Sequence, residues 1–79
     1  MMINFDAADS FDTNLQVCYE ILLYLSSRLA KLQTGEIFEF VSGDAEAADK
    51  IEAWCEARGF TLLENGFSPD GRFRFLIQK

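Results

Sequence analysis

The apolar residues of this chain recur at two spacings, and the order in which these spacings alternate limits the fold more than any other feature. Across residues 18–32 apolar side chains recur three or four positions apart, which places them along one face of a helix. That stripe consists of Cys18, Ile21, Leu22, Leu25, Leu29 and Leu32. In "EIFEFVS" (36–42) the side chains instead alternate between two faces, as on a strand. We therefore predict a helix that runs to about Gln33, stops before Gly35 and is followed by a strand.

A second helix is predicted over residues 45–58. Asp44 precedes it as the expected N-cap residue, and Gly59 follows it where a left-handed C-terminal residue is expected. Cys55 lies on its apolar side, next to Trp54. We expect Cys55 to be a small buried hydrophobe, because a buried thiol is inert.

Three further segments carry strand signals. Weak alternation around Phe11 places a first strand within residues 3–13, and residues 60–65 and 72–79 form two more strands joined by the turn "SPDG". The predicted order is therefore β-α-β-α-β-β. Right-handed crossovers put both helices on the same face of the sheet. We predict an α/β (α+β) two-layer sandwich with a four-stranded mixed sheet, and a single domain over residues 1–79.

Charge and residue types exclude several classes of function. Thirteen acidic residues against seven basic ones give a net charge of −6, which argues against direct binding to nucleic acid or to an anionic membrane. The same charge favours a protein partner with a basic patch. The absence of histidine excludes a Ser-His-Asp or Cys-His pair, and two cysteines alone cannot make a zinc site. No glycine-rich phosphate loop is present, and we expect neither a cofactor nor a metal.

The compartment follows from what the first residues lack. Residues 1–10 have neither a basic n-region nor an apolar h-region, so no signal peptide is expected. The longest apolar run, Ile21–Leu25, is too short to span a bilayer. We expect a cytoplasmic protein, in which Cys18 and Cys55 stay reduced and form no structural disulfide.

Three stretches together carry a family resemblance: "FDTNLQVCYE", "GEIFEFVSGDAEAADKIEAWCEARGF" and "GRFRFLIQK". In this order they resemble the TusA/SirA family of small sulfur-carrier proteins, over nearly the whole chain after residue 10. The resemblance implies a β-α-β-α-β-β sandwich like the C-terminal domain of bacterial translation initiation factor three. It also implies a persulfide on one cysteine, loaded by a cysteine desulfurase or another sulfurtransferase and passed to an acceptor protein.

The resemblance assigns the sulfur-carrying role to Cys18. In the family this cysteine opens a Cys-Pro-x-Pro motif at the start of the first helix, and Asp12 and Glu20 also match the family pattern. Tyr19 and Ile21 stand here where the family has its two prolines. The implied site is therefore Cys18 as the catalytic residue, with possible support from Asp12, Tyr19 and Glu20.

The residues around Cys18 allow two placements of its thiol. Proline at the first helical position would stop the helix from extending backwards. Without it, Thr13-x-x-Gln16 has the pattern of a capping box that begins the helix near Asn14. Cys18 would then lie inside the helix on its apolar face, where burial raises its pKa. If the helix begins at about Tyr19, the thiol is exposed at the positive end of the helix, which favours the thiolate.

The supporting residues each have a structural and a functional interpretation. Asp12 could cap the turn before the cysteine or be solvated. Tyr19 could shield a persulfide, and with Leu23 and Tyr24 it could form an apolar patch around the thiol, unless neighbouring loops cover these side chains. Glu20 is favoured by the helix dipole but opposes thiolate formation.

Two functions follow from the sequence. The first is a relay protein that accepts sulfane sulfur on Cys18 and passes it on, a carrier with sulfurtransferase chemistry and without an acid–base pair of its own. The second is a non-catalytic protein-binding or regulatory module that kept the fold and lost the persulfide chemistry. No motif names the donor, the acceptor, the pathway or the oligomeric state.

Overall fold

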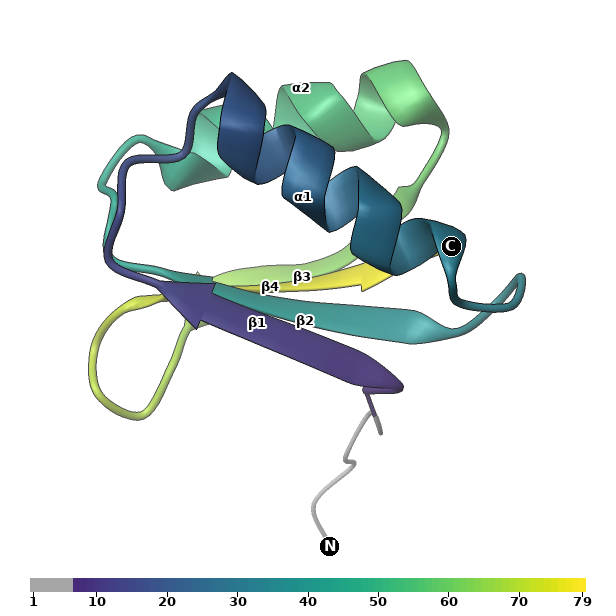
Figure 1. Ribbon diagram of the computed structural model, residues 1–79. Coiled ribbons are helices and arrows are strands. Elements are labelled where there is room, and N and C mark those ends of the chain that lie inside the picture. Colours follow the sequence, from purple (N-terminus) through teal and green to yellow (C-terminus); the bar gives the residue numbers. More distant parts are fainter. Residues whose placement is uncertain (1–6) are drawn as a thin grey trace, which may run out of the picture.

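The computed structural model describes residues 7–79 and shows six elements in the predicted order (Figure 1). They are β1 (Asp9–Thr13), α1 (Tyr19–Ala30), β2 (Ile37–Ser42), α2 (Ala47–Arg58), β3 (Thr61–Phe67) and β4 (Phe73–Gln78). Two expectations concern the first six residues and lie outside the described residues: the absence of a signal peptide, and a first strand that begins as early as residue 3.

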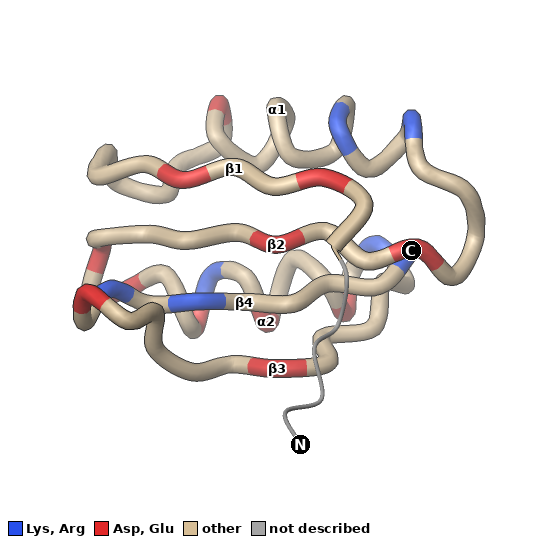
Figure 2. The backbone as a smooth tube through the Cα atoms, turned by 90° about the horizontal axis from the view of Figure 1, so that it is seen from below, with Lys and Arg blue, Asp and Glu red and all other residues tan. Residues whose placement is uncertain are grey.

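The four strands form one mixed sheet in the order β1-β2-β4-β3, which Figure 2 shows from the side opposite the helices. β1 and β2 run parallel, with Phe11 opposite Phe40, and β4 is antiparallel to both β2 and β3. Both helices cover the same face of the sheet (Figure 1). The predicted fold class is therefore confirmed. Right-handed crossovers after β1 and after β2 place both helices on the same face of the sheet.

The core lies between the sheet and the two helices. Phe38, Phe40 and Phe75 are fully buried on the helix-facing side of the sheet, and Leu25 and Leu29 of α1 are fully buried above them. Burial of each of these side chains contributes about 1.5–3 kcal/mol to folding. The part of the predicted stripe that lies on α1, from Ile21 to Leu29, therefore faces the sheet, whereas Cys18 lies before the helix and is exposed.

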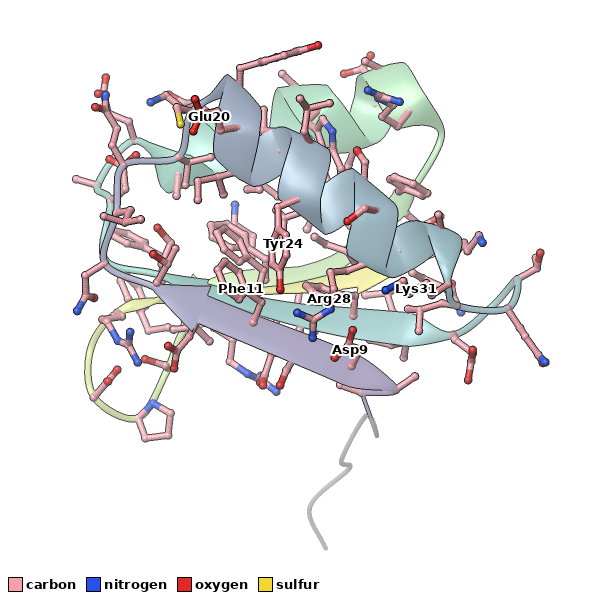
Figure 3. All side chains as sticks on the ribbon, in the orientation of Figure 1. Asp9, Phe11, Glu20, Tyr24, Arg28 and Lys31 are labelled. Atoms are coloured by element: carbon pink, nitrogen blue, oxygen red, sulfur yellow. The ribbon has the colours of Figure 1, made fainter. Side chains whose placement is uncertain are left out.

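α1 is also fixed to the edge strand β1 by polar and aromatic contacts (Figure 3). The Arg28 guanidinium donates to the carboxylate of Asp9 at 2.5 and 2.7 Å, and this hydrogen bond lowers the pKa of Asp9. The rings of Tyr24 and Phe11 meet edge to face with centroids 4.8 Å apart. Arg28 also donates to the hydroxyl of Tyr24. These contacts set the direction of the helix that begins after Cys18.

Two helix boundaries differ from the prediction. α1 ends at Ala30 rather than near Gln33, because the next two amides, of Lys31 and Leu32, bond to carbonyls three residues back and tighten the chain into a turn. α2 begins at Ala47, two residues later than predicted. The end of α2 is confirmed, since Gly59 follows Arg58 in the left-handed region with φ of +78°.

The predicted turn between the last two strands is also confirmed. Gly71 adopts φ of +87°, a conformation that favours glycine, and its N–H donates to the carbonyl of Ser68 at 3.0 Å. The hairpin brings Arg72 to the end of the sheet where β1 and β2 also end.

The prediction that Asp44 caps α2 is wrong. The N-cap residue is Glu46, and Asp44 lies two residues before it in the β2–α2 loop. One carboxylate oxygen of Asp44 accepts from the N–H of Glu46 at 3.0 Å, and the other accepts from the N–H of Val17 at 2.9 Å. Because Val17 lies in the β1–α1 loop, this carboxylate connects two loops that are distant in the sequence.

Candidate functional site at the start of α1

Cys18 is the N-cap residue of α1, and its thiol is exposed and free. Its backbone is extended, with φ of −127° and ψ of −178°, while its carbonyl already accepts the first helical hydrogen bond, from Leu22 N–H at 3.0 Å. The amides of the first turn have no partners within the helix and point toward this end. The sequence left two starting points for this helix, near Asn14 and at about Tyr19. The start at Tyr19 is confirmed.

The capping box expected from Thr13-x-x-Gln16 does not form. The hydroxyl of Thr13 accepts instead from the N–H of Leu15 at 3.0 Å, which closes a short turn directly after β1. Residues 14–18 have no helical structure. A helix from Asn14 is therefore excluded in the folded protein.

Val17 turns the chain so that the cysteine faces outward. Its side chain is fully buried and belongs to the core cluster, while both of its neighbours are exposed. In an extended segment successive side chains point in opposite directions, so burial of Val17 directs Cys18 away from the core. The loop before α1 thus has one apolar anchor and one exposed thiol, side by side.

Gly43 and Asp44 hold this loop from the end of β2. The N–H of Gly43 donates to the carbonyl of Thr13 at 3.1 Å, and the carboxylate of Asp44 accepts from Val17. Hydrogen bonds from the backbone amides of Glu46 and Val17 lower the pKa of Asp44, so its carboxylate stays charged at neutral pH. Lys50 adds an ion pair with a 3.7 Å separation between its Nζ and an Asp44 oxygen.

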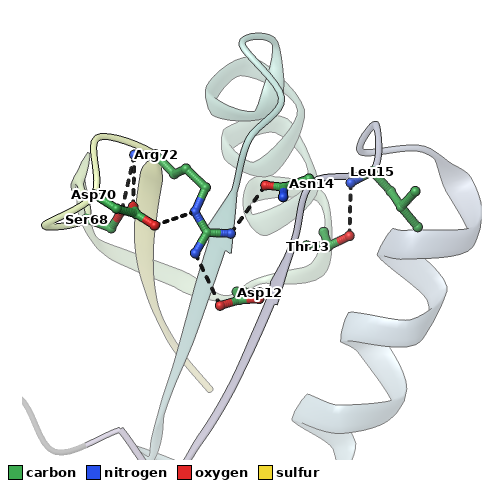
Figure 4. A network of polar contacts seen from close by, with 7 residues as sticks. All are labelled: Asp12, Thr13, Asn14, Leu15, Ser68, Asp70 and Arg72. Carbon is green, nitrogen blue, oxygen red and sulfur yellow. Dashed lines mark hydrogen bonds and ion pairs between the residues drawn. The ribbon is translucent and has the colours of Figure 1, made fainter.

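Arg72 holds the same loop from the β3–β4 hairpin (Figure 4). Its guanidinium donates to Asn14 and to Asp12, both at 3.3 Å, and to Asp70 at 2.9 Å. The carboxylate of Asp12 therefore binds an arginine, while the loop amides are bound by Thr13 and Asp44. Of the two interpretations open for Asp12, capping of the turn is not what the structure shows, and the side chain is largely exposed beside Arg72.

Three exposed apolar side chains belong to the segment around Cys18, and we refer to Leu15, Tyr19 and Leu23 as the apolar patch. Tyr19 is 73% exposed, Leu15 is 66% exposed and Leu23 is 44% exposed. Tyr19 directly follows Cys18, and Leu23 lies one turn further along the same side of α1. Tyr24, which the sequence also placed in such a patch, is 41% exposed, but its ring packs on Phe11 and its hydroxyl accepts from Arg28. Glu20, exposed in the first turn, adds negative charge beside the patch.

Cys55 is in a different environment. It lies inside α2 and is 2% exposed, and burial raises the pKa of its thiol to about 11. Trp54 beside it packs on Phe60 with ring centroids 5.3 Å apart. The expected structural role of Cys55 is confirmed.

Within residues 7–79, no three His, Cys, Asp or Glu side chains are placed to hold a metal ion. Over the same residues no helix is long and apolar enough to cross a membrane. Both cysteines are free. Within this part of the chain, the chemistry that the site offers is therefore that of one accessible thiol.

Comparison with known proteins identifies the family. The chain matches the family of the sulfurtransferase TusA over residues 10–79. This chain belongs to the TusA family. The match covers both helices and nearly all of the sheet, including the whole loop that carries Cys18. Membership in the TusA family supports a sulfur-carrier role with protein partners. No curated protein matches the chain.

The residues that position the cysteine in this TusA-family protein have no recognisable signal of this role in the sequence. The strand predicted over residues 36–42 ends before Gly43, and Asp44 is predicted as a helix cap, so neither residue is connected with the cysteine in the sequence. Arg72 gave no signal of its contact with the cysteine loop. The "GD" pair is a visible turn signal, but its partners in another loop become apparent only in the folded structure.

Proposed function

We propose that this protein accepts sulfane sulfur as a persulfide on Cys18 and passes it to a partner protein in a sulfur relay. The observation that supports this most directly is the exposed thiol at the N-cap position of α1. The thiol occupies this position although Tyr19 and Ile21 replace the two prolines of the family motif.

The transfer needs a thiolate and no cofactor. The Cys18 thiolate attacks the outer sulfur of a donor persulfide, R–S–SH, so that a new S–S bond forms while the S–S bond of the donor breaks. The donor leaves as the thiolate R–S⁻, and Cys18 becomes a persulfide that keeps the proton of the transferred sulfur. One S–S bond replaces another, so no external oxidant or reductant is consumed. The reverse exchange with an acceptor thiolate unloads the carrier.

The position of Cys18 favours negative charge on sulfur. The positive end of the α1 dipole and the amides of its first turn, which have no partner within the helix, face this end. Glu20 opposes this effect, because its carboxylate lies in the same turn. The amides at this helix end can donate hydrogen bonds to an anionic sulfur.

The proposed partners dock over the apolar patch. Leu15, Tyr19 and Leu23 offer exposed apolar area at the thiol, and aromatic residues are enriched at interface centres. With a net charge of −6, the protein suits a donor and an acceptor that present an apolar pocket bordered by basic side chains. A cysteine desulfurase or another sulfurtransferase is the proposed donor. The proposed compartment is the cytoplasm, where thiols stay reduced.

A second candidate function rests on the rewritten motif. With both prolines replaced, the fold could serve as a binding or regulatory module that uses the apolar patch without carrying sulfur. Such a module would keep its partner after Cys18→Ser, whereas the carrier would lose its activity.

Intact-protein mass spectrometry tests the proposed function. The wild type, Cys18→Ser and Cys55→Ser are each incubated with polysulfide, or with a cysteine desulfurase and cysteine. We expect a gain of one sulfur atom in the wild type and in Cys55→Ser, and none in Cys18→Ser. No gain in any folded variant would overturn the carrier function and leave the binding module.

A further inference from the structure

If α1 were one turn longer at its N-terminus, one further hydrogen bond would close that turn. Both the donor and the acceptor of that bond already have other partners in the folded protein. A helix that began at Asn14 would close its first turn with a bond from Val17 N–H to the carbonyl of Thr13. In the structure that N–H donates to Asp44 at 2.9 Å, and that carbonyl accepts from Gly43 N–H at 3.1 Å. Two consecutive residues at the end of β2 therefore take up both groups that the longer helix needs.

We propose that Gly43 and Asp44 are positioning residues that stop α1 at Tyr19 and thereby keep the Cys18 thiol exposed. Their importance for sulfur transfer rests on the proposed function, but the helix stop itself does not. A proline at the start of the helix would stop it from within the same segment of the chain. Here the stop comes from a neighbouring loop, which replaces the restraint that the missing prolines would have provided.

Gly43 lies close to the cysteine loop, next to the side chain of Asn14. A Cβ atom added to Gly43 would lie 2.8 Å from Oδ1 of Asn14, a separation that Cβ atoms essentially never show. The same Asn14 oxygen accepts from Arg72 at 3.3 Å, so it is not free to turn away without losing that bond. A side chain at position 43 would therefore displace the side chain of Asn14 from its contact with Arg72, which loosens the cysteine loop.

Release of the loop has a defined alternative state. Thr13-x-x-Gln16 is a capping box that becomes usable once Thr13 and Val17 are free. A helix from Asn14 would place Cys18 on the stripe of Ile21 and Leu25, which faces the core. Positioning by Gly43 and Asp44 therefore decides between an exposed and a covered thiol.

Alkylation of Cys18 by iodoacetamide tests this inference without any sulfur donor. Rates are measured against pH for the full-length wild type, Asp44→Ala, Asp44→Asn and the control Asp49→Ala, and the alkylated cysteine is identified by peptide mass spectrometry. Asp49 is a matched control because it is an exposed aspartate in the first turn of α2. We expect the rate at the high-pH plateau to fall in Asp44→Ala by the fraction of molecules whose thiol becomes covered, because loss of a hydrogen bond to a charged group shifts the equilibrium toward the longer helix by about tenfold. Far-UV circular dichroism is expected to show added helix.

The remaining variants separate positioning from charge and from misfolding. Asp44→Asn keeps one acceptor oxygen for two amides and is expected to fall between the wild type and Asp44→Ala. Gly43→Ala is expected to slow alkylation at the plateau, and the double variant Gly43→Ala/Asn14→Ala is expected to restore it, because the obstructing oxygen is gone. Unfolded molecules are recognised by alkylation of Cys55. If one variant unfolds, the remaining variants still test the inference.

Three results would overturn the inference. One is an unchanged or faster plateau rate in folded Asp44→Ala. Another is a shift of the apparent thiol pKa alone, which would mean that Asp44 acts only through its charge. The third is a double variant Gly43→Ala/Asn14→Ala that alkylates as slowly as Gly43→Ala alone. A wild type that alkylates as expected but takes up no sulfur would refute the proposed function and leave the helix stop intact.

Discussion

The two cysteines of this protein carry the same side chain in opposite circumstances. Cys55 lies inside α2 on the side that faces the core, whereas Cys18 lies one residue before the first turn of α1 and is exposed. If α1 began one turn earlier, Cys18 would occupy in α1 the kind of place that Cys55 occupies in α2. The difference between a chemically available thiol and an inert one is thus set by the residue at which a helix begins.

The largest expected effect is the difference in reactivity between the two thiols. Burial raises the pKa of Cys55 from an ordinary 9.0 to about 11. That shift alone lowers its thiolate fraction near neutral pH about a hundredfold, before exclusion of the reagent is counted. We expect iodoacetamide to label Cys18 and leave Cys55 unlabelled in the native protein, as read by peptide mass spectrometry. Denaturant is the control, because it is expected to make both cysteines react. Labelling of both cysteines in the folded protein would contradict the expected difference between them.

The apolar patch is expected to matter for protein partners and not for the thiol itself. Tyr19→Ala is expected to slow loading from a cysteine desulfurase about tenfold, the range of a single interface anchor, and to leave loading from polysulfide unchanged. Phe67→Ala is a matched control, since Phe67 is also an exposed aromatic, 70% accessible, but lies on the edge strand β3. An equal loss of loading rate in both variants, or slower loading from polysulfide, would contradict a role of the apolar patch in docking.

Serine at the two positions is expected to affect stability differently. Cys55→Ser places a hydroxyl in the core and is expected to lower the free energy of unfolding by about 1–2 kcal/mol. Cys18→Ser changes an exposed N-cap residue to one that caps well, so a change within about 0.5 kcal/mol is expected. Urea unfolding monitored by circular dichroism measures both. Equal destabilisation by the two substitutions would contradict the assignment of Cys55 to the core and Cys18 to the surface.

The smallest expected effect is a dependence of stability on acid. Backbone hydrogen bonds from Glu46 and Val17 hold the pKa of Asp44 below its ordinary 3.8 in the folded protein. A carboxylate with a lowered folded pKa contributes stability that is fully present above the unfolded value and is lost as pH falls through the folded one. The wild type is therefore expected to be more stable than Asp44→Asn at about pH 5, with the difference shrinking at about pH 3.

Comparison with the variant is needed because other carboxylates share this pH range. Asp9 and Asp70 also have lowered pKa values, held by hydrogen bonds from Arg28 and Ser68 respectively. Their contributions are present in both proteins and cancel in the difference. A difference that stayed constant from about pH 5 to about pH 3 would show that the charge of Asp44 does not stabilise the loop.

Local patterns predicted the elements of the fold, and contacts between distant residues decided where the patterns were ambiguous. The stripe on α1, the alternation in β2 and the glycines at the ends of α2 and of the last turn all act within a few residues, and each prediction is confirmed. The capping box at Thr13 is equally local, yet it does not form. It is displaced by a hydrogen bond between Val17 and Asp44, which lie 27 residues apart in the sequence.

The candidate site shows the same division. From the residues alone, the local pattern favoured a buried Cys18, and only the family resemblance favoured exposure. The roles of Asp12, Tyr19 and Glu20 in sulfur transfer stay predictions, although the structure shows where each side chain lies. Asp44 could not be recognised, because a carboxylate before a helix is ordinarily read as its cap.

The order of the chain gives the helix stop a consequence for biosynthesis. Gly43 and Asp44 follow α1 in the sequence, so the ribosome releases the helix before the residues that stop it. Until β2 has paired with β1, Thr13 and Val17 lack the partners that stop the helix in the folded protein. The cysteine loop therefore takes its final form only after the parallel strand pair has assembled, although Cys18 itself is made early.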